Sequence, residues 1–267
     1  MASRLWTRQE TELALYLYFQ TTFGRIHQRN PEIIKLAQAI DRTPSSVAMK
    51  LSNFASLDPE ITGSGRSGLK GASSLDREVF AQFLDNWEGL VAECSRRWDD
   101  LIATEVPRAV DRQDGGLREV SDGFGQFPAN APSTASRVVE VRRGQQFFRR
   151  AVLANYGSKC CITGIADERL LNASHIKPWT LDEMNRHNPA NGFSLSATFD
   201  RAFDRGLMTI MQGEVITFSR QLLEHRSQET RDYFKKYEGK AISPASRFAP
   251  DADLIKWHND WFIEAGA

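Results

Sequence analysis

One histidine and two aspartates in the second half of the chain have side chains that together can hydrolyse a phosphodiester bond. Asp200 and Asp204 are four residues apart, a spacing that shares one helix face, so both carboxylates could bind one cation. Oxygen ligands favour a hard ion such as Mg²⁺ or Mn²⁺, which polarises the phosphodiester and stabilises the leaving alkoxide. His175, when neutral, can take the proton from an attacking water molecule.

Each of these residues also has a purely structural explanation. A histidine at the end of a strand is commonly a hydrogen-bonded structural group. Asp200 and Asp204 are followed by Arg201 and Arg205, so surface ion pairs could account for the two carboxylates. Only the order and spacing of the whole set favour the chemical interpretation.

The segments around these residues predict a strand, a long loop, a second strand and a helix. Residues 170–176 have the composition of a strand that runs into His175, and the dipeptide Asn191-Gly192 marks a turn. Residues 197–205 predict a helix with Phe199 and Phe203 facing inward. This order of elements brings one imidazole towards the two carboxylates.

The N-terminal part of the chain predicts three short helices. Thr7 and Glu10 form a capping-box pattern at the start of a helix over 7–22, and Pro31 and Pro44 suit the first turns of two more. The pattern favours a helix-turn-helix arrangement that reads DNA, although a plain three-helix bundle with a polar surface would look the same. Four residues are expected on the exposed face of the third helix, where they would contact bases or phosphates: Ser45, Ser46, Lys50 and Asn53.

A change of composition indicates a boundary between two domains. Gly, Ser, Pro and Ala are frequent over 111–136, which is typical of a linker. We therefore expect a helical domain over 1–110 and a second domain over 137–267. Within these domains we also expect a long helix over 75–102, a short strand over 138–141 and a helix over 144–156.

The overall charge is balanced, but one segment is basic. With 34 basic and 34 acidic residues, composition alone does not indicate a nucleic-acid surface. Between 137 and 159, however, Glu140 is the only acid among several basic residues. Such a cluster could neutralise phosphates or form a solvated helix face. The basic residues are Arg137, Arg142, Arg143, Arg149, Arg150 and Lys159.

The apolar residues and the cysteines predict a soluble protein of the cytoplasm. There is no run of 18 apolar residues, and the N-terminus is polar, so we expect neither a membrane span nor a signal peptide. Cys94, Cys160 and Cys161 cannot form an even set of disulfides, and adjacent cysteines rarely bridge each other. Reduced thiols are therefore expected.

Residues 137–262 resemble the HNH endonuclease family, through motifs that occur in the family's order. The motifs are Thr163-Gly164, Ala173-Ser-His-Ile-Lys-Pro-Trp179, Asn188-Pro-Ala-Asn-Gly192 and Phe203-Asp-Arg-Gly-Leu207. More loosely, the N-terminal segment resembles the leader region of restriction-type HNH proteins. The resemblance implies an α+β protein, with the helical domain followed by an HNH domain of the ββα-metal fold.

The resemblance also implies a role for each site residue. His175 takes the place of the general base, and Asn191 that of the asparagine that braces the long loop through backbone hydrogen bonds. Asp200 stands where the family has its final histidine, which shifts the expected metal towards Mg²⁺ or Mn²⁺. Ser174 replaces a common metal ligand, so Asp204 or water is expected to take that place. The paired cysteines of a structural zinc site are missing, so no zinc is expected.

The expected function is metal-dependent hydrolysis of double-stranded DNA by a restriction-type endonuclease. Phosphate contacts are expected from Arg143, Arg149, Lys177 and Arg201. Because one active site cuts one strand, double-strand cutting calls for a dimer or for sequential nicking, and a homodimer on a palindromic site is the simplest arrangement. Two alternatives stay open, a nuclease that requires modified DNA such as methylated DNA, and a DNA-binding protein whose HNH fold has lost catalysis.

Overall fold

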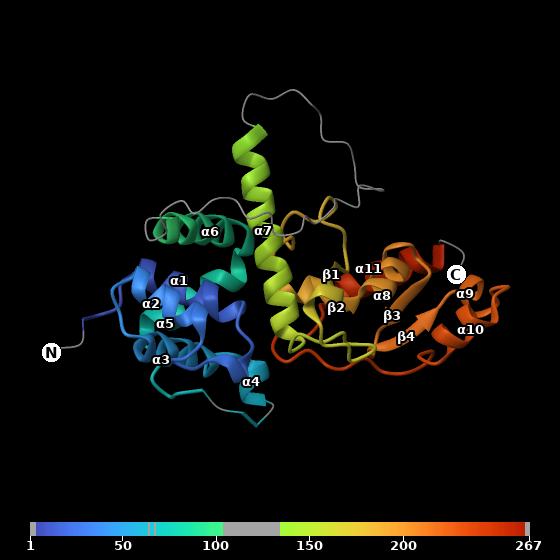
Figure 1. The fold of residues 1–267 in the computed structure, drawn as a ribbon, viewed down its shortest axis with the longest axis horizontal. Helices are drawn as coiled ribbons and strands as arrows, with labels where there is room; N and C mark the ends of the chain where they lie inside the picture. Colours follow the sequence, from blue (N-terminus) through green and yellow to red (C-terminus); the bar gives the residue numbers. More distant parts are fainter. Residues whose placement is uncertain (1–3, 64, 67, 104–133, 265–267) are drawn as a thin grey trace.

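The structure, a computed structural model, describes residues 4–63, 65–66, 68–103 and 134–264. It combines helices with two small antiparallel sheets, so the α+β prediction is confirmed. Figure 1 shows α7 standing between a group of helices from the first half of the chain and the strands and helices of the second half. Most of the linker expected over 111–136 lies outside the described residues, so the domain boundaries stay a prediction.

The first half of the described chain is entirely helical. Thr7 accepts a hydrogen bond from the Glu10 backbone, and Glu10 returns one to the Thr7 backbone, so the predicted capping box is present. Proline opens the second and third helices, as expected. The elements are α1 (Arg8–Phe19), η1 (Phe23–Arg25), α2 (Pro31–Ala39), α3 (Pro44–Ala55), α4 (Pro59–Gly63), α5 (Ser74–Asp85) and α6 (Trp87–Ala103).

The single long helix predicted over 75–102 is wrong, because α5 and α6 are separate. Asn86 leaves the helical region, with φ −144° and ψ 68°. Its side-chain oxygen then accepts a hydrogen bond from the backbone of Gly89 at 3.0 Å. A short polar side chain that bonds nearby backbone competes with helix continuation, and this local competition ends α5.

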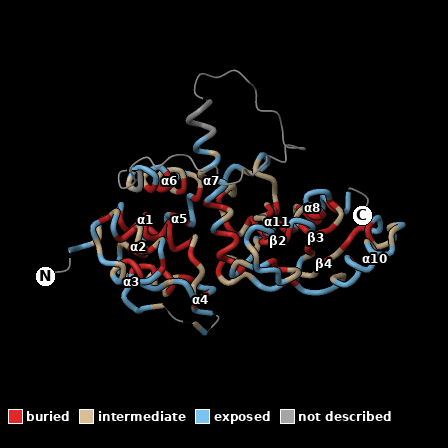
Figure 2. Tube along the Cα trace, viewed as in Figure 1, coloured by how far each residue is buried: buried red, intermediate tan, exposed pale blue. Residues whose placement is uncertain are grey.

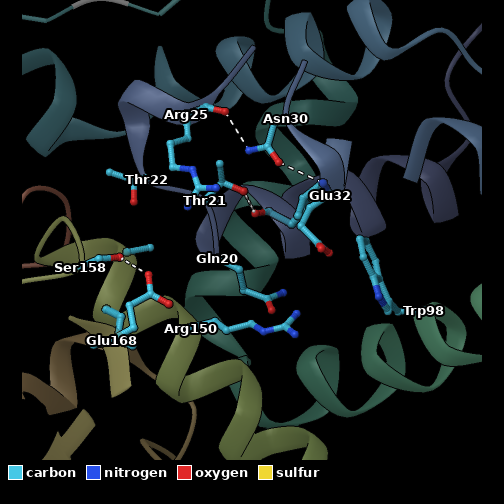
Figure 3. A pocket seen from close by; sticks show the side chains of 13 residues that line it. Gln20, Thr21, Thr22, Arg25, Asn30, Glu32, Trp98, Arg150, Ser158 and Glu168 are labelled. Atoms are coloured by element: carbon cyan, nitrogen blue, oxygen red, sulfur yellow. Dashed lines mark hydrogen bonds between the residues drawn. The ribbon is translucent and has the colours of Figure 1, made fainter. Parts of the chain in front are cut away.

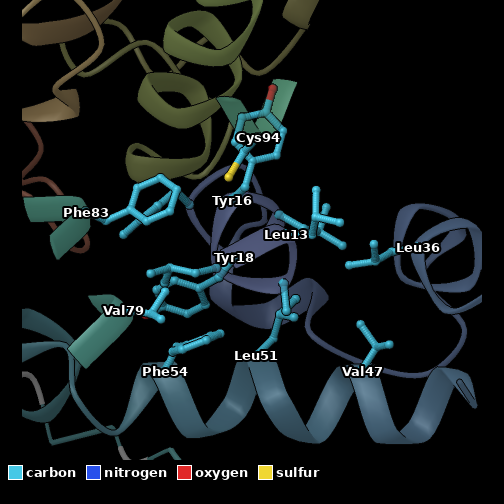
Figure 4. Packing of buried hydrophobic residues seen from close by; sticks show 14 of the residues in the cluster. Leu13, Tyr16, Tyr18, Leu36, Val47, Leu51, Phe54, Val79, Phe83 and Cys94 are labelled. Carbon is cyan, nitrogen blue, oxygen red and sulfur yellow. The ribbon is translucent and has the colours of Figure 1, made fainter. Parts of the chain in front are cut away.

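The core of the helical half surrounds α1. Every residue from Leu13 to Phe19 is buried, and α3, α5 and α6 pack against this helix. Figure 4 shows Val47, Leu51 and Phe54 of α3 directed towards it, with Phe83 of α5 on another side. Burial of these apolar surfaces is the main force that assembles the helices.

The helix α7 (Thr134–Asn155) belongs to both halves of the molecule. Phe147 and Ala151 pack into the core around α1, whereas Phe148 and Val152 pack into the second core. The strand predicted over 138–141 is wrong, because these residues form an early part of α7. The β-branched composition of that segment is a weak local preference, and the surrounding helix overrides it.

The second half begins with a hairpin followed by a helix. Strands β1 (Leu171–His175) and β2 (Gly192–Ser196) pair antiparallel, with His175 opposite Gly192, and α8 (Ala197–Asp204) follows directly. The predicted strand over 170–176 and helix over 197–205 are therefore confirmed. The remaining elements are η2 (Glu168–Leu170), η3 (Pro189–Asn191), β3 (Met208–Met211), β4 (Val215–Phe218), α9 (Arg220–Leu223), α10 (Gln228–Lys235) and α11 (Ala252–Glu264).

A buried arginine from the second half of the chain binds backbone groups of the first half. Arg247 is 1% exposed, and its guanidinium donates to the backbone oxygens of Tyr18, at 2.6 Å, and Thr21. Figure 2 shows buried segments on both sides of α7, in line with two adjoining cores. None of the described helices is long and apolar enough to cross a membrane.

Candidate active site

His175 ends β1 in a defined orientation. Its ring stacks on Phe148 of α7, with the centroids 3.7 Å apart and the planes at 6°. The Nε2 atom is 3.0 Å from the carbonyl oxygen of Arg186. Because a carbonyl only accepts, Nε2 carries the proton and Nδ1 holds the free lone pair of the neutral ring.

The protonation state of His175 follows from its surroundings. Burial lowers its pKa from 6.5 to about 4, against the opposing effect of the Arg186 carbonyl. The imidazole is therefore neutral near pH 7. The residue still keeps some exposed surface, so a small molecule such as water can approach it.

Asn191 holds the two ends of the long loop between β1 and β2 together; we call residues 176–191 the site loop. The asparagine is fully buried. Its side chain accepts from the backbone of Lys177 at 2.9 Å and donates to the carbonyls of Lys177 and Asn185 at 3.1 and 3.2 Å. These are backbone hydrogen bonds of the kind that the family resemblance implies for Asn191.

Asp200 lies on α8, which packs against β1. Asn172 donates to one of its carboxylate oxygens at 2.5 Å, and the Ser174 hydroxyl donates to the other. Asn172 and Ser174 are two residues apart in a strand, so they share a face. Ser174 therefore orients the Asp200 carboxylate, whereas the sequence alone indicated only the loss of a metal ligand at Ser174. The alternation of side chains along the strand, which places residues 172 and 174 on one face, could have indicated this role.

Asp204 is electrostatically coupled to Asp200. Its pKa is raised from 3.8 to about 6, first by burial and then by the charge of Asp200, against the opposing effect of Arg201 and Arg205. The residue itself keeps exposed surface. Burial and the neighbouring Asp200 thus both disfavour the charged form of Asp204.

The fit of these residues to a divalent cation is partial. The oxygen chemistry of Asp200 and Asp204 and their mutual repulsion both suit a hard cation. Within the described ranges, however, no group of three or more His, Cys, Asp or Glu side chains gathers as a metal site. A cation held by the two carboxylates would need further ligands from water or a bound phosphate.

Of the basic residues expected to contact phosphates, Arg149 already has structural partners. Its guanidinium donates to the carbonyls of Leu171 and Glu168, both at 2.7 Å, and so ties α7 to the start of β1. Arg143 pairs with Asp99 of α6 at 2.6 Å, and Lys177 lies 3.4 Å from Asp182. Arg201 is exposed, with no ion pair among the described residues, and is the one most available to a phosphate.

The residues expected on the exposed face of α3 are not all exposed. Ser45 is exposed, and Ser46 and Asn53 are half-buried. Lys50 is buried, with its ammonium 2.6 Å from Asp76 and 4.7 Å from the centroid of Trp6. The expectation for Lys50 is wrong, because Asp76, in the capping box that starts α5, draws the lysine inward.

The cysteines near the site are core residues. Cys160 and Cys161 are buried and unbridged. Burial raises the pKa of the Cys161 thiol well above its usual value, so the thiol is protonated.

A polar cleft of about 290 Å³ lies between α1, α2 and α7. Figure 3 shows Gln20 and Arg150 near its centre, with Glu168 and Trp98 at opposite sides. Trp98 is the aromatic side chain among the residues that line it. The cleft is on the side of α7 where Arg150 points, whereas Phe148 of the same helix contacts His175.

Comparison with protein families identifies part of the chain. Residues 160–211 match the model of the HNH endonuclease family, and this segment contains β1, the site loop, β2, α8 and β3. His175, Asn191, Asp200 and Asp204 all lie within it. The small hairpin followed by a helix is consistent with an HNH domain. No curated protein matches the chain.

Proposed function

We propose, on the premise that residues 160–211 belong to the HNH endonuclease family, that the protein is a metal-dependent endonuclease that cuts double-stranded DNA. The observation that carries the proposal is the hydrogen bond from His175 Nε2 to the Arg186 carbonyl. It leaves Nδ1 as the basic atom of a ring that is neutral at physiological pH. A neutral imidazole whose Nδ1 has no hydrogen-bond partner among the described residues is suited to accept a proton from water.

The remaining residues of the site would support this base. Phe148 fixes the plane of the His175 ring, and Asn191 closes the loop that supplies the Arg186 carbonyl. Asn172 and Ser174 orient Asp200. Asp200 and Asp204 would hold the cation, which when bound supplies charge stabilisation at the scissile phosphate and its leaving oxygen.

DNA contacts are proposed where the structure leaves suitable side chains available. Arg201 is beside the acidic pair and exposed, which supports a phosphate contact close to the scissile bond. Lys177 and Arg143 would first have to leave exposed or half-exposed ion pairs, which are weak. Ser45, Ser46 and Asn53 of α3 are the candidates for contacts in the N-terminal half.

A restriction-type enzyme is the form of the proposal that we favour. Cutting both strands with one site per chain supports a homodimer on a palindromic sequence. A reader of modified DNA encloses a flipped base between apolar or aromatic faces. Trp98 is the aromatic residue that lines the cleft beside α7. A single aromatic side chain supports a reader of modified DNA less strongly than the site residues support a restriction-type enzyme.

The test is a cleavage assay across metal ions. The full chain is incubated with unmodified and with methylated supercoiled plasmid, in Mg²⁺, Mn²⁺ or EDTA, beside Asp200→Asn and Asp232→Asn. We expect nicked or linear DNA only with a metal, and a loss of roughly tenfold or more in Asp200→Asn but not in the control variant from α10. Tight DNA binding with intact plasmid under every condition would contradict the proposal.

A further inference from the structure

His187 joins the site loop to the N-terminal helices. Its Nδ1 is 2.9 Å from the Oε2 of Glu88 on α6, and its side chain is only 5% exposed. Partial burial would raise the pKa of Glu88, but His187 and Arg186 outweigh it and the pKa is lowered. Glu88 is thus held electrostatically by two consecutive residues of the site loop.

The space for His187 is made by a glycine on α7. A Cβ at Gly144 would lie 2.0 Å from Nε2 of the His187 ring, so no other residue fits there without displacing the ring. Both ring nitrogens and the Glu88 Oε2 are buried and outside hydrogen-bond geometry within the described structure. Leaving such a buried polar pair without hydrogen bonds is energetically costly.

His187 is connected to the proposed base by direct contacts. The residue before it, Arg186, supplies the carbonyl that binds His175 Nε2. Trp179 lies between the two histidines, edge to face with His187 at 5.2 Å and with His175 at 5.9 Å. Arg186 also donates to the Trp179 carbonyl at 3.0 Å, so these residues form one packed unit.

From these contacts we infer that Glu88 and His187 are positioning residues, through which the N-terminal helices set the orientation of His175. A shift of α6 would move His187, then the Arg186 carbonyl, and finally the imidazole that this carbonyl orients. The catalytic consequence rests on the proposed nuclease function. The mechanical coupling between Glu88 and His175 does not.

The first experiment measures that coupling without any cleavage. The full chain is labelled with ¹⁵N-histidine, and NMR reports which nitrogen of each ring is protonated and how fast its proton exchanges. In the wild type, His175 should show a single Nε2–H form with slow exchange. In Glu88→Ala this signal should shift and exchange faster, whereas in Glu93→Ala, which removes a carboxylate that pairs with Arg97 on the same helix, it should not.

A second variant approaches the same contact from α7. Gly144→Ala should displace the His187 ring and change the His175 signal in the same direction. Thermal unfolding confirms that each variant is folded. An unchanged His175 signal in folded Glu88→Ala and Gly144→Ala would overturn the inference.

The second experiment tests the consequence for catalysis. Glu88→Ala should lower the single-turnover cleavage rate roughly tenfold, because displaced catalytic groups lose rate steeply, while the Kd for DNA changes less than about twofold. A lower affinity with an unchanged cleavage rate would instead contradict a positioning role. If the wild type cuts no DNA but the His175 signal still responds to Glu88→Ala, the coupling stands and the proposed function fails.

Discussion

His175 and His258 are two imidazoles in similar surroundings that differ in one respect. Each stacks on a phenylalanine, at 3.7 Å on Phe148 and 3.8 Å on Phe203, and burial lowers the pKa of each to about 4. His258 Nδ1 is 2.8 Å from the buried Thr209 hydroxyl, so its lone pair is used inside the core. The Nδ1 of His175 has no such partner among the described residues, which is what makes it available as a base.

The protonation of His175 gives a prediction at this scale. Because burial disfavours the charged ring, His175 should remain neutral down to about pH 5, well below the pKa of an exposed histidine near 6.5. A ¹⁵N NMR titration of the folded protein measures this directly. A titration midpoint near 6.5 for His175 would show that the ring is not enclosed as described.

Asp204 gives a second residue-scale prediction. Its pKa is raised, whereas the pKa of an aspartate in a folded protein is usually lowered, so its effect on stability has the opposite sign. Its folded-state pKa is raised from 3.8 to about 6, so its charge destabilises the fold once the pH rises through that range. Without metal, Asp204→Asn should be more stable than the wild type at about pH 7.5 by on the order of 1 kcal/mol, allowing for solvent screening. The difference should vanish below about pH 4, where the wild-type aspartate is also neutral.

The control for Asp204 is the same measurement with Mg²⁺ added. A cation between the two carboxylates removes their repulsion, so Mg²⁺ should stabilise the wild type more than the variant. Denaturant unfolding curves supply both values. Equal stabilisation of the two proteins by Mg²⁺ would speak against Asp204 as a ligand.

At the scale of elements, the sequence predicted best where local pattern and tertiary packing agree. The helix with Phe199 and Phe203 on one face, and the strand that ends at His175, formed as expected. Prediction failed where packing overrides local preference. Residues 138–141 look like a strand but belong to α7, and Asn86 divides a helix that the apolar pattern shows as continuous.

Contacts between elements were beyond the reach of the sequence. The burial of Lys50 depends on Asp76, and the orientation of His175 depends on a backbone carbonyl eleven residues away. Every residue has a backbone carbonyl, so the residue type at position 186 could not have indicated this contact with His175. The stacking of Phe148 on His175 likewise depends on how α7 meets β1.

The site loop provides the element-scale prediction. Asn191→Ala removes three hydrogen bonds to backbone groups at 2.9–3.2 Å and leaves the N–H and the carbonyl of Lys177 unpaired, which should cost about 1–3 kcal/mol of stability. It should also speed proteolysis within 176–191. Asn188→Ala, which loses only local bonds to Asn185 and Ala190, should cost clearly less. Equal losses in both variants would remove the special role of Asn191.

At the scale of the whole molecule, the two halves are joined by polar contacts as well as by the shared helix α7. Arg247 reaches the carbonyls of Tyr18 and Thr21, and its guanidinium lies 4.4 Å from the Tyr18 ring. Asn155, at the end of α7, binds the backbone of the same segment through Arg247 and Phe248. These contacts keep the N-terminal helices in a fixed position relative to the second half.

Removing the buried guanidinium should therefore weaken the whole molecule. Arg247→Met removes the guanidinium donor from the buried Thr21 carbonyl and one of the donors from the Tyr18 carbonyl, and should lower the free energy of unfolding by about 2–4 kcal/mol. Lys256→Met, at an exposed residue of α11, is the control and should change it by less than about 0.5 kcal/mol. Denaturant unfolding compares them, and a similar small effect in both variants would contradict this view of the contact.

The central claim is that His175 is the base of a DNA-cutting site, and the rate of plasmid cleavage tests it most directly. Wild type, His175→Ala and His225→Ala are compared in single-turnover reactions with Mg²⁺, after DNA binding and thermal stability have been checked. We predict a loss of about a hundredfold or more in His175→Ala and none in His225→Ala. Cleavage by His175→Ala at the wild-type rate would contradict the claim.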